Sequence, residues 1–255
     1  MADAENARLR AELEATRAQL ASALTGACAR AELTLPTCDA HSPAGRFRSA
    51  CEGSGISPSV QHRWWGVLRD AYCASGLAYH NMAHISCMLD RVSEWAATGA
   101  LVNSTLVNFA VFFHDAIYDP RAKDNEARSA QLWRDFCAIA SGSSLSPSDV
   151  QTVAVYIERT ARHLDGPASG DLAYFLDADL AVLGWQPPAY AEYARAVRLE
   201  YAHVPSAEFA TKRAAVLSHF AAAPTLYFGP LREADARARA NLAAEIQRLE
   251  RRPQA

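Results

Sequence analysis

Histidine and aspartate side chains interrupt apolar runs in four segments of this 255-residue chain. The segments are YHNMAHISCMLD (79–90), NFAVFFHDAIYD (108–119), ERTARHLD (158–165) and FLDADLAVLG (175–184). In the second segment, an apolar run carries His114 and Asp115 side by side into a hydrophobic setting. A buried carboxylate beside a buried imidazole needs a compensating charge, and a divalent cation supplies it while keeping the imidazole neutral and the carboxylate ionised. These residue types in this setting therefore predict a metal site.

The spacing within two of these segments indicates which side chains share a surface. His80 and His84 are four residues apart, so on a helix both imidazoles would project from one face and reach a common point. Asp177 and Asp179 are two residues apart, so on a helix they would lie on different faces and only one could point directly at an ion. Spacing alone leaves open which of the two aspartates does so.

The order of these motifs resembles that of the HD superfamily of metal-dependent phosphohydrolases, in which a histidine, an adjacent His-Asp pair and a distant Asp lie on helices. The likeness is closest to small predicted HD phosphohydrolases and more distant to cyclic-nucleotide phosphodiesterases. The matching motifs are YHNxxH (79–84), FHDxxYDP (113–120), a DNE segment (124–130, with Arg128 in a variable place) and FLDADLxxLG (175–184). The likeness covers roughly residues 60–250, so it leaves the N-terminal part of the chain outside it.

The resemblance implies a ligand set and a proton donor. The residues that would hold the metal are His84, His114, Asp115 and Asp179. The family pattern matches Asp179 rather than Asp177, and it allows Asp115 to bridge two ions. His80 would be the proton donor, because a histidine one helical turn from a ligand lies near the ion and titrates around neutral pH. Two His and two Asp ligands suit a divalent ion of Mn, Fe, Zn, Co or Mg, with one or two ions bound.

The reaction implied by the resemblance is hydrolysis of a phosphate ester of a small nucleotide or another phosphorylated metabolite. A metal-bound hydroxide would attack the phosphorus while His80 protonates the departing oxygen, with Asp115 as a catalytic metal ligand. Both a phosphomonoesterase and a phosphodiesterase fit this description. Specificity depends on pocket residues that a single sequence does not locate.

Two alternatives to the hydrolase remain open at this point. Some HD proteins are di-iron oxygenases, which use additional histidines to hold a second iron, and His163 is the one spare candidate for such a role. A non-catalytic metal-binding interaction protein is the other alternative. A degenerate relative should have lost a ligand or the proton donor, whereas every one of those positions is filled here.

Four further residues are candidates for contacts with the substrate or with the metal ligands. His163 could be a third imidazole at the site, a substrate contact or an exposed residue. Asn81 could brace a loop or a ligand, and Glu126 could hold a ligand histidine or a water molecule. Asp177 competes with Asp179. Three cations after the His-Asp pair could meet a substrate phosphate or form a solvated helix face: Arg121, Lys123 and Arg128.

The elements that must position these residues are predicted to be helices. From about residue 58 the apolar positions recur at spacings of three and four, and alternating β-branched runs are missing. We therefore expect an all-α fold, a single HD-domain helical bundle of about seven to ten helices, over 58–255. Ser146, Pro147 and Asp149 predict a helix start. Further breaks are predicted at 166–170, 184–188, 204–206 and 221–230, where Pro or Gly stops a helix.

The N-terminal part of the chain is expected to differ from this domain. Its apolar stripe consists of Leu9, Leu13, Thr16, Leu20 and Ala23. This stripe predicts a helical extension over 1–33, which either lies on the body of the protein or pairs two copies as a homodimer. The looser composition that follows predicts a linker over 34–57.

Composition excludes several partners. The chain has 25 Lys and Arg against 28 Asp and Glu, a formal net charge of −3, so it lacks the basic field that drives binding to polymeric nucleic acid. No run of 18 apolar residues and no signal-peptide pattern is visible, which predicts a cytoplasmic protein without a membrane partner. The six cysteines are scattered and form no CxxC pair, so we expect reduced thiols.

Overall fold

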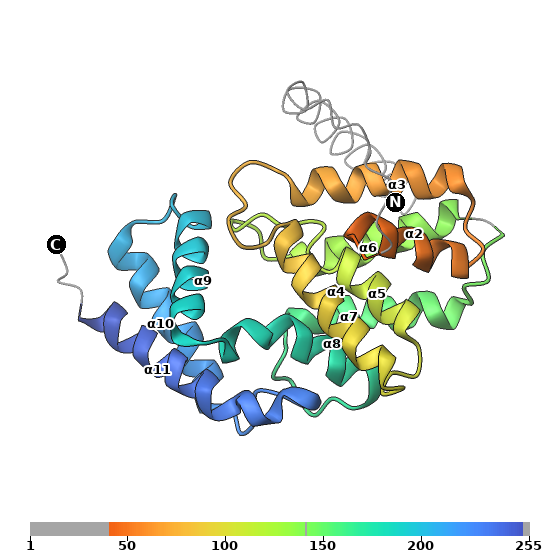
Figure 1. The fold of residues 1–255 in the computed structure, drawn as a ribbon. Helices are drawn as coiled ribbons and strands as arrows, with labels where there is room; N and C mark the ends of the chain where they lie inside the picture. The colour runs from red at the N-terminus through yellow and green to blue at the C-terminus, as the bar shows by residue number, and fades with distance from the viewer. Residues whose placement is uncertain (1–40, 141, 252–255) are drawn as a thin grey trace, which may run out of the picture. The chain divides into compact units, whose positions relative to one another are not determined.

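The computed structural model describes residues 41–140 and 142–251, and all regular structure in these ranges is helical. In chain order the elements are α2 (Pro43–Gly53), α3 (Pro58–Tyr72), α4 (Met82–Ala97), α5 (Ser104–Phe113), α6 (Asn125–Ile139), α7 (Pro147–Thr160), α8 (Gly170–Leu180), the 3₁₀-helix η1 (Ala181–Gly184), α9 (Pro187–Glu200), α10 (Ser206–Ala222), the 3₁₀-helix η2 (Pro230–Ala234) and α11 (Asp235–Glu250). Figure 1 shows this arrangement, which confirms the predicted all-α fold class. The predicted extension at 1–33 lies outside the described residues.

Helix α5 is the centre of the larger hydrophobic core. Its sequence STLVNFAVFF is apolar on almost every face. A helix of that kind is stable only when it is buried in the protein interior. Asn103 caps its start by accepting a hydrogen bond from the Leu106 amide. Helices α2, α4, α6, α7 and α8 all pack against it. The C-terminal end of α5 is therefore held rigidly from several sides, which matters because the His-Asp pair follows it directly.

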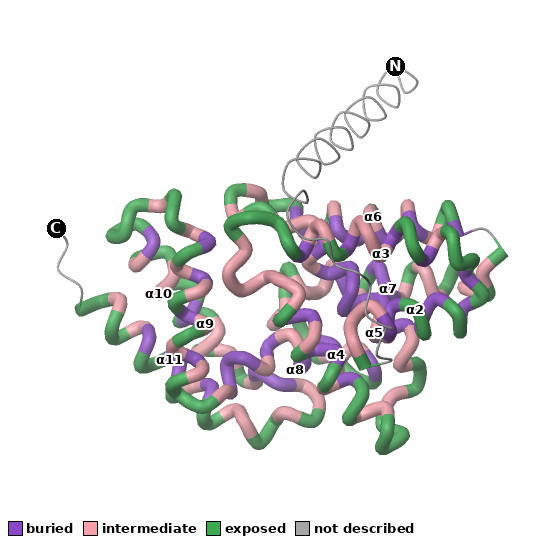
Figure 2. Tube along the Cα trace, turned by 45° about the horizontal axis from the view of Figure 1, so that its top comes forward, coloured by how far each residue is buried: buried purple, intermediate pink, exposed green. Residues whose placement is uncertain are grey.

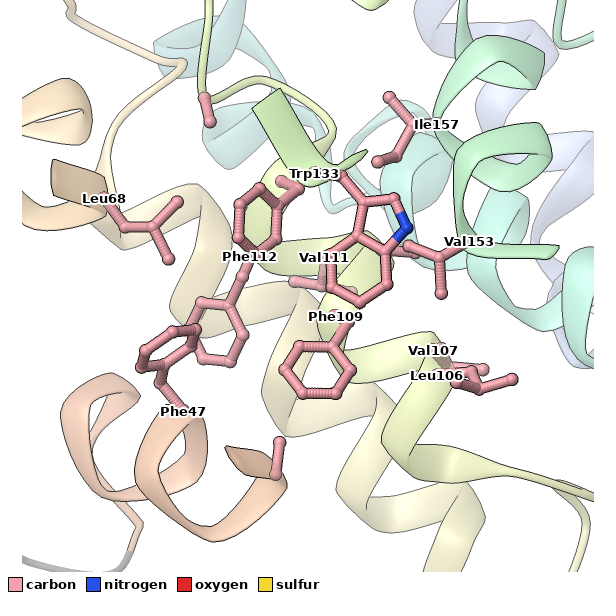
Figure 3. Close-up of a cluster of buried hydrophobic side chains, with 14 of the residues drawn as sticks. Phe47, Leu68, Leu106, Val107, Phe109, Val111, Phe112, Trp133, Val153 and Ile157 are labelled. Carbon is pink, nitrogen blue, oxygen red and sulfur yellow. The ribbon is translucent and has the colours of Figure 1, made fainter. Parts of the chain in front are cut away.

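Aromatic rings fill much of the space around α5, as Figure 3 shows. Phe47 of α2 meets Phe112 edge to face with ring centroids 5.2 Å apart. On another side, Phe109 packs against Trp133 of α6 at 5.0 Å. Each fully buried ring contributes roughly 1.5–3 kcal/mol through the hydrophobic effect alone. This aromatic packing ties three helices into one core.

The linker predicted over 34–57 is wrong for its second half, because residues 43–53 form α2. Ser42 accepts a hydrogen bond from the Gly45 amide, and Pro43 occupies the first helical turn. Phe47 and Cys51 are buried on its inner face. A Ser-Pro start followed by glycine is compatible with a loop as well as a helix, so the local composition is ambiguous. The described residues 41–140 and 142–251 belong to one compact unit that begins well before residue 58.

A second, smaller hydrophobic cluster joins η1 with α9, α10 and α11. Helices α10 and α11 pack along each other, and Leu183, Tyr190 and Tyr227 are buried among them. Figure 2 shows buried stretches in both groups of helices. The chain passes from the first cluster to the second through α8 and η1. None of the described helices combines the length and apolar character needed to cross a membrane.

The predicted helix boundaries are confirmed at the clearest signals. Ser146 caps α7 in a reciprocal arrangement, in which Ser146 accepts from the Asp149 amide while the Asp149 carboxylate accepts from the Ser146 amide. The other predicted breaks, at 166–170, 184–188, 204–206 and 221–230, each fall between two elements. Strong capping and Pro or Gly signals were therefore sufficient to locate helix ends.

Candidate metal centre

Three helix ends bring four of the predicted site residues together. His84 lies in the first turn of α4, whose start is capped by the Asn81 side chain. His114 and Asp115 follow the last residue of α5, and Asp179 lies in the final turn of α8. Because α4 and α8 both pack on α5, these side chains converge on one region at the edge of the core.

The distances within this group are short. The Nε2 atoms of His84 and His114 are 3.3 Å apart. One carboxylate oxygen of Asp179 lies 3.2 Å from the His84 Nε2 and 3.6 Å from the His114 Nε2. A carboxylate oxygen of Asp115 lies 3.1 Å from the same His114 atom. The four side chains therefore meet around the two facing ring nitrogens of His84 and His114, and we call these four residues, as candidate ligands, the metal-ligand group.

These separations fit the requirements of a divalent ion. Ligand atoms bonded at about 2.0–2.2 Å to one ion lie about 3.0–3.5 Å from each other in tetrahedral or octahedral geometry. The other ring nitrogen of His114, Nδ1, lies 2.9 Å from the Val111 carbonyl oxygen, and a hydrogen bond donated there leaves Nε2 free as a ligand. The donor atoms of His84, His114 and Asp115 all lie within 4.8 Å of one another, as ligands of a single ion would.

The electrostatics of the group point in the same direction. Burial lowers the pKa of His114, but the Asp115 and Asp179 carboxylates outweigh it and raise that pKa well above its ordinary value. Burial raises the pKa of Asp115, yet the charge of His114 and its hydrogen bond bring it down to about 2. The pKa of Asp179 is held well below its usual range against its burial, first by the hydrogen bond with His114. The two carboxylates therefore favour positive charge beside them, which a divalent ion would supply.

His163 also reaches this group, through Asp179. Its Nε2 lies 2.8 Å from the second carboxylate oxygen of Asp179, so one oxygen of that residue faces the two ligand histidines and the other faces His163. The His163 ring packs against Phe220 of α10 at a centroid distance of 6.4 Å. In this position His163 fixes the orientation of Asp179.

His80 does not lie on the helix that carries His84, contrary to the prediction that both project from one helical face. Helix α4 begins at Met82, and His80 lies in the turn before it. The His80 and His84 rings remain close, with centroids 6.2 Å apart. The turn, rather than a shared helical face, brings His80 to the edge of the metal-ligand group.

Glu200 at the end of α9 holds His80 and its turn in place. One carboxylate oxygen accepts the backbone amides of Ala78, Tyr79 and His80 at 2.9, 2.7 and 2.9 Å. The other oxygen lies 2.7 Å from the His80 Nδ1. The Glu200 side chain is 1% exposed, so its carboxylate is shielded from solvent. Burial lowers the pKa of His80, but the hydrogen bond to Glu200 and nearby carboxylates outweigh it and raise that pKa.

Tyr118 covers the other side of His80. The two rings stack with centroids 4.0 Å apart and planes inclined by 22°. Tyr118 follows the His-Asp pair by three residues, and its hydroxyl lies 3.5 Å from Glu200. His80 is therefore clamped between a carboxylate on its Nδ1 and an aromatic ring on its face.

The remaining predicted site residues have other tasks. Asn81 braces the turn, because its side chain caps α4 and donates to the Ala78 carbonyl oxygen. Asp177 turns away from the metal-ligand group and accepts three backbone amides between Phe228 and Leu231. Glu126 lies in the first turn of α6, and among the described residues no hydrogen bond or ion pair joins it to the metal-ligand group. Asp177 therefore serves the backbone around Gly229, whereas the role of Glu126 stays a prediction.

Sequence reasoning missed Glu200 and Tyr118. Tyr190, Ala194 and Val197 mark the buried face of α9, and Glu200 continues that face at its next position. A carboxylate on an apolar helical stripe needs a buried partner, and this signal could have drawn attention to it. Nothing local, however, identifies the partner as a residue that precedes it by 120 positions.

Comparisons of the chain with protein-family models, with curated proteins and with solved structures gave no match. The interpretation of this site therefore rests on its geometry and on the sequence motifs.

Proposed function

We propose that this protein is a metal-dependent phosphohydrolase of the HD type that acts on a phosphate ester of a small molecule. The observation that supports it best is the convergence of His84, His114, Asp115 and Asp179 on one point. His80 adds a second element, since Glu200 favours the protonated form of an imidazole at the edge of that point. A set of metal ligands alone would also fit a structural ion. A set of metal ligands beside a proton donor such as His80, fixed in position by Glu200, fits hydrolysis.

The residues divide the work as follows. His84, His114, Asp115 and Asp179 would hold the ion, with the compact group favouring one ion over two. The low pKa of Asp115, about 2, makes it a weak base, which suits a metal ligand better than a proton acceptor. A divalent ion held there lowers the pKa of a water molecule and polarises a phosphoryl oxygen.

The reaction balances with His80 as the proton donor. The oxygen of water forms a bond to phosphorus, and the bond between phosphorus and the leaving oxygen breaks. The electron pair of that bond goes to the leaving oxygen, which takes a proton from His80. The attacking water releases a proton, and the neutral His80 regains one from solvent, so an ester and water give an alcohol and phosphate. Glu200 positions His80 throughout by its contact with Nδ1, which leaves Nε2 to deliver the proton.

The test is hydrolysis by the purified protein of a panel of phosphate monoesters and diesters, with Mn, Fe, Zn, Co or Mg added separately. We expect metal-dependent release of the alcohol, abolished in Asp115→Asn and preserved in Asp165→Asn, which removes an exposed carboxylate elsewhere. Release that continues after chelation, or that survives Asp115→Asn, would contradict the proposal. Bound metal without turnover on any ester would favour a non-catalytic metal-binding protein instead.

A further inference from the structure

A cavity of about 650 Å³ opens next to His80. Its walls come from the turn that carries His80, the segment after α5, and helices α9 and α10. This volume lies within the range of about 300–1,000 Å³ that is typical of small-molecule sites. His80 is the one residue shared by this cavity and the proposed catalytic machinery, apart from its stacking partner Tyr118.

The position of His80 indicates which part of a substrate enters this cavity. The proton donor must lie beside the leaving oxygen, so the rest of the leaving group extends to the side of His80 that faces away from the ligands. A smaller cavity of about 240 Å³ borders His84 instead and does not include His80. That smaller cavity is lined by Asp90, Arg91 and Glu94, of which Arg91 pairs with Glu94, so its charged lining is net acidic and suits an anion less well. The larger cavity is therefore the one that suits the leaving group.

The inner walls of the larger cavity suit a flat apolar body. Tyr118, Tyr193, Tyr201 and Phe209 all line it, with Val197 beside them. Aromatic side chains provide large contact surfaces for another ring, through offset stacking or edge-to-face contact.

Positive charge gathers at the same cavity. Four cationic side chains line it, and none of its described lining residues is acidic: the cations are Arg121, Lys123, Lys212 and Arg213. Arg213 is neutralised by the buried Glu245 at 3.1 Å, and Lys212 pairs with Glu208 at 2.6 Å. Arg121 and Lys123 form no ion pair with any described carboxylate. These two exposed cations are therefore available to a ligand.

We propose that this cavity holds the leaving group of the substrate, and that the leaving group carries an aromatic ring and a second negative charge that meets Arg121 and Lys123. The inference rests on the proposed function, because it takes His80 as the proton donor. The substrate would then be a phosphate ester whose alcohol part carries an aromatic ring and a second anionic group. Nucleotides with a further phosphate or carboxylate belong to this class.

The test uses ligands that bind but cannot be hydrolysed. Propylphosphonate lacks a ring, benzylphosphonate has one, and 4-carboxybenzylphosphonate adds the second anion. Their dissociation constants are measured by calorimetry on the full-length, manganese-loaded protein. We expect 4-carboxybenzylphosphonate to bind about tenfold more tightly than benzylphosphonate, because two exposed charge pairs contribute about that much. Propylphosphonate should bind most weakly.

The double variant Arg121→Ala/Lys123→Ala should lose the preference for the carboxylated ligand and keep its affinity for benzylphosphonate. The matched control Arg63→Ala/Arg248→Ala removes two exposed cations outside the cavity and should keep the preference. Equal affinity of the wild type for both aromatic ligands would overturn the proposal, as would a preference that survives in the double variant.

Hydrolysis of phenyl phosphate and 4-carboxyphenyl phosphate is measured separately, so that the two proposals can fail independently. No hydrolysis of either ester, with the carboxylate preference intact, would overturn the hydrolase and leave an anion-binding aromatic cavity. Hydrolysis of both esters at equal efficiency by the wild type and the double variant would overturn the assignment of this cavity to the leaving group.

Discussion

Replacement of Glu200 by glutamine tests whether this residue positions and charges His80. The amide keeps an oxygen for the three backbone amides of the turn but removes the negative charge beside the His80 Nδ1. A hydrogen bond to a charged group contributes about 1.5–3 kcal/mol. Loss of this bond to the charged carboxylate lowers the pKa of His80, because Glu200 is what holds that pKa up against burial. The variant therefore holds less protonated His80 above neutral pH.

The assay compares a pair of phosphate esters, one with phenol and one with 4-nitrophenol as the leaving group. Phenol needs the proton more, so kcat for its ester should fall by about 10- to 100-fold above neutral pH, while the 4-nitrophenyl ester is affected much less. The alkaline limb of the phenyl-ester pH profile should move to lower pH, because the acid form of His80 is lost at a lower pH in the variant.

A control variant separates positioning from stability. Asp171→Asn also replaces a buried carboxylate that holds backbone amides, those of Val102 and Asn103, and it lies outside the site. It should lower the melting temperature without changing the ratio between the two esters. If Glu200→Gln lowered hydrolysis of both esters equally and left the pH profile in place, the assigned role of Glu200 would be refuted.

Three further outcomes follow from the structure. The affinity for the metal should rise with pH, because the ion must displace a proton from His114, whose pKa is raised. Calorimetry in buffers of different ionisation enthalpy should show about one proton released on binding. An affinity that does not change with pH would contradict this. Gly184→Ala should lose about 1–3 kcal/mol of stability by denaturant unfolding, since a Cβ there would lie 2.9 Å from two neighbours, whereas Gly66→Ala in open space on α3 should be neutral or stabilising. Burial raises the pKa of Cys51 to about 12, so iodoacetamide should label the exposed Cys73 in the native protein and leave Cys51 unmodified, as peptide mass spectrometry can check.

The residues alone singled out the His114–Asp115 pair, because it follows a strongly apolar run. An apolar run such as the one before His114 must be buried, and its polar end must then be satisfied nearby. The helix starts were equally local, since Ser146, Pro147 and Asp149 specify an N-terminus within four residues. The fold class followed from such local signals, whereas the full ligand set was implied by the resemblance of the motifs to the HD pattern.

The rest of the site depends on contacts between distant segments. Glu200 reaches a turn 120 residues before it, and that contact exists only once α9 packs beside the turn. His80 was placed on a helix because its spacing from His84 fits one, but the side-chain cap provided by Asn81 starts the helix after it. Asp177 resembled a ligand by its position in the sequence. Its role is decided instead by the loop around Gly229, whose backbone amides come close enough to donate hydrogen bonds to the Asp177 carboxylate.

The cavity beside His80 could not be predicted for the same reason. Arg121 and Lys123 follow the His-Asp pair in sequence, whereas Tyr201 and Phe209 belong to elements that come some eighty residues later. A cluster of charges on a short connecting segment is usually solvated. Such a cluster can contribute to a binding site only when aromatic side chains from another part of the chain line the same cavity.

Anomalous diffraction from crystals grown with excess manganese is the most direct test of the metal centre. We expect an anomalous peak within bonding distance of the Nε2 atoms of His84 and His114 and of the carboxylates of Asp115 and Asp179. The same crystals of Asp115→Asn should show a weaker peak or none. If the wild-type protein showed no manganese among these four side chains, the metal centre and the hydrolase built on it would both be contradicted.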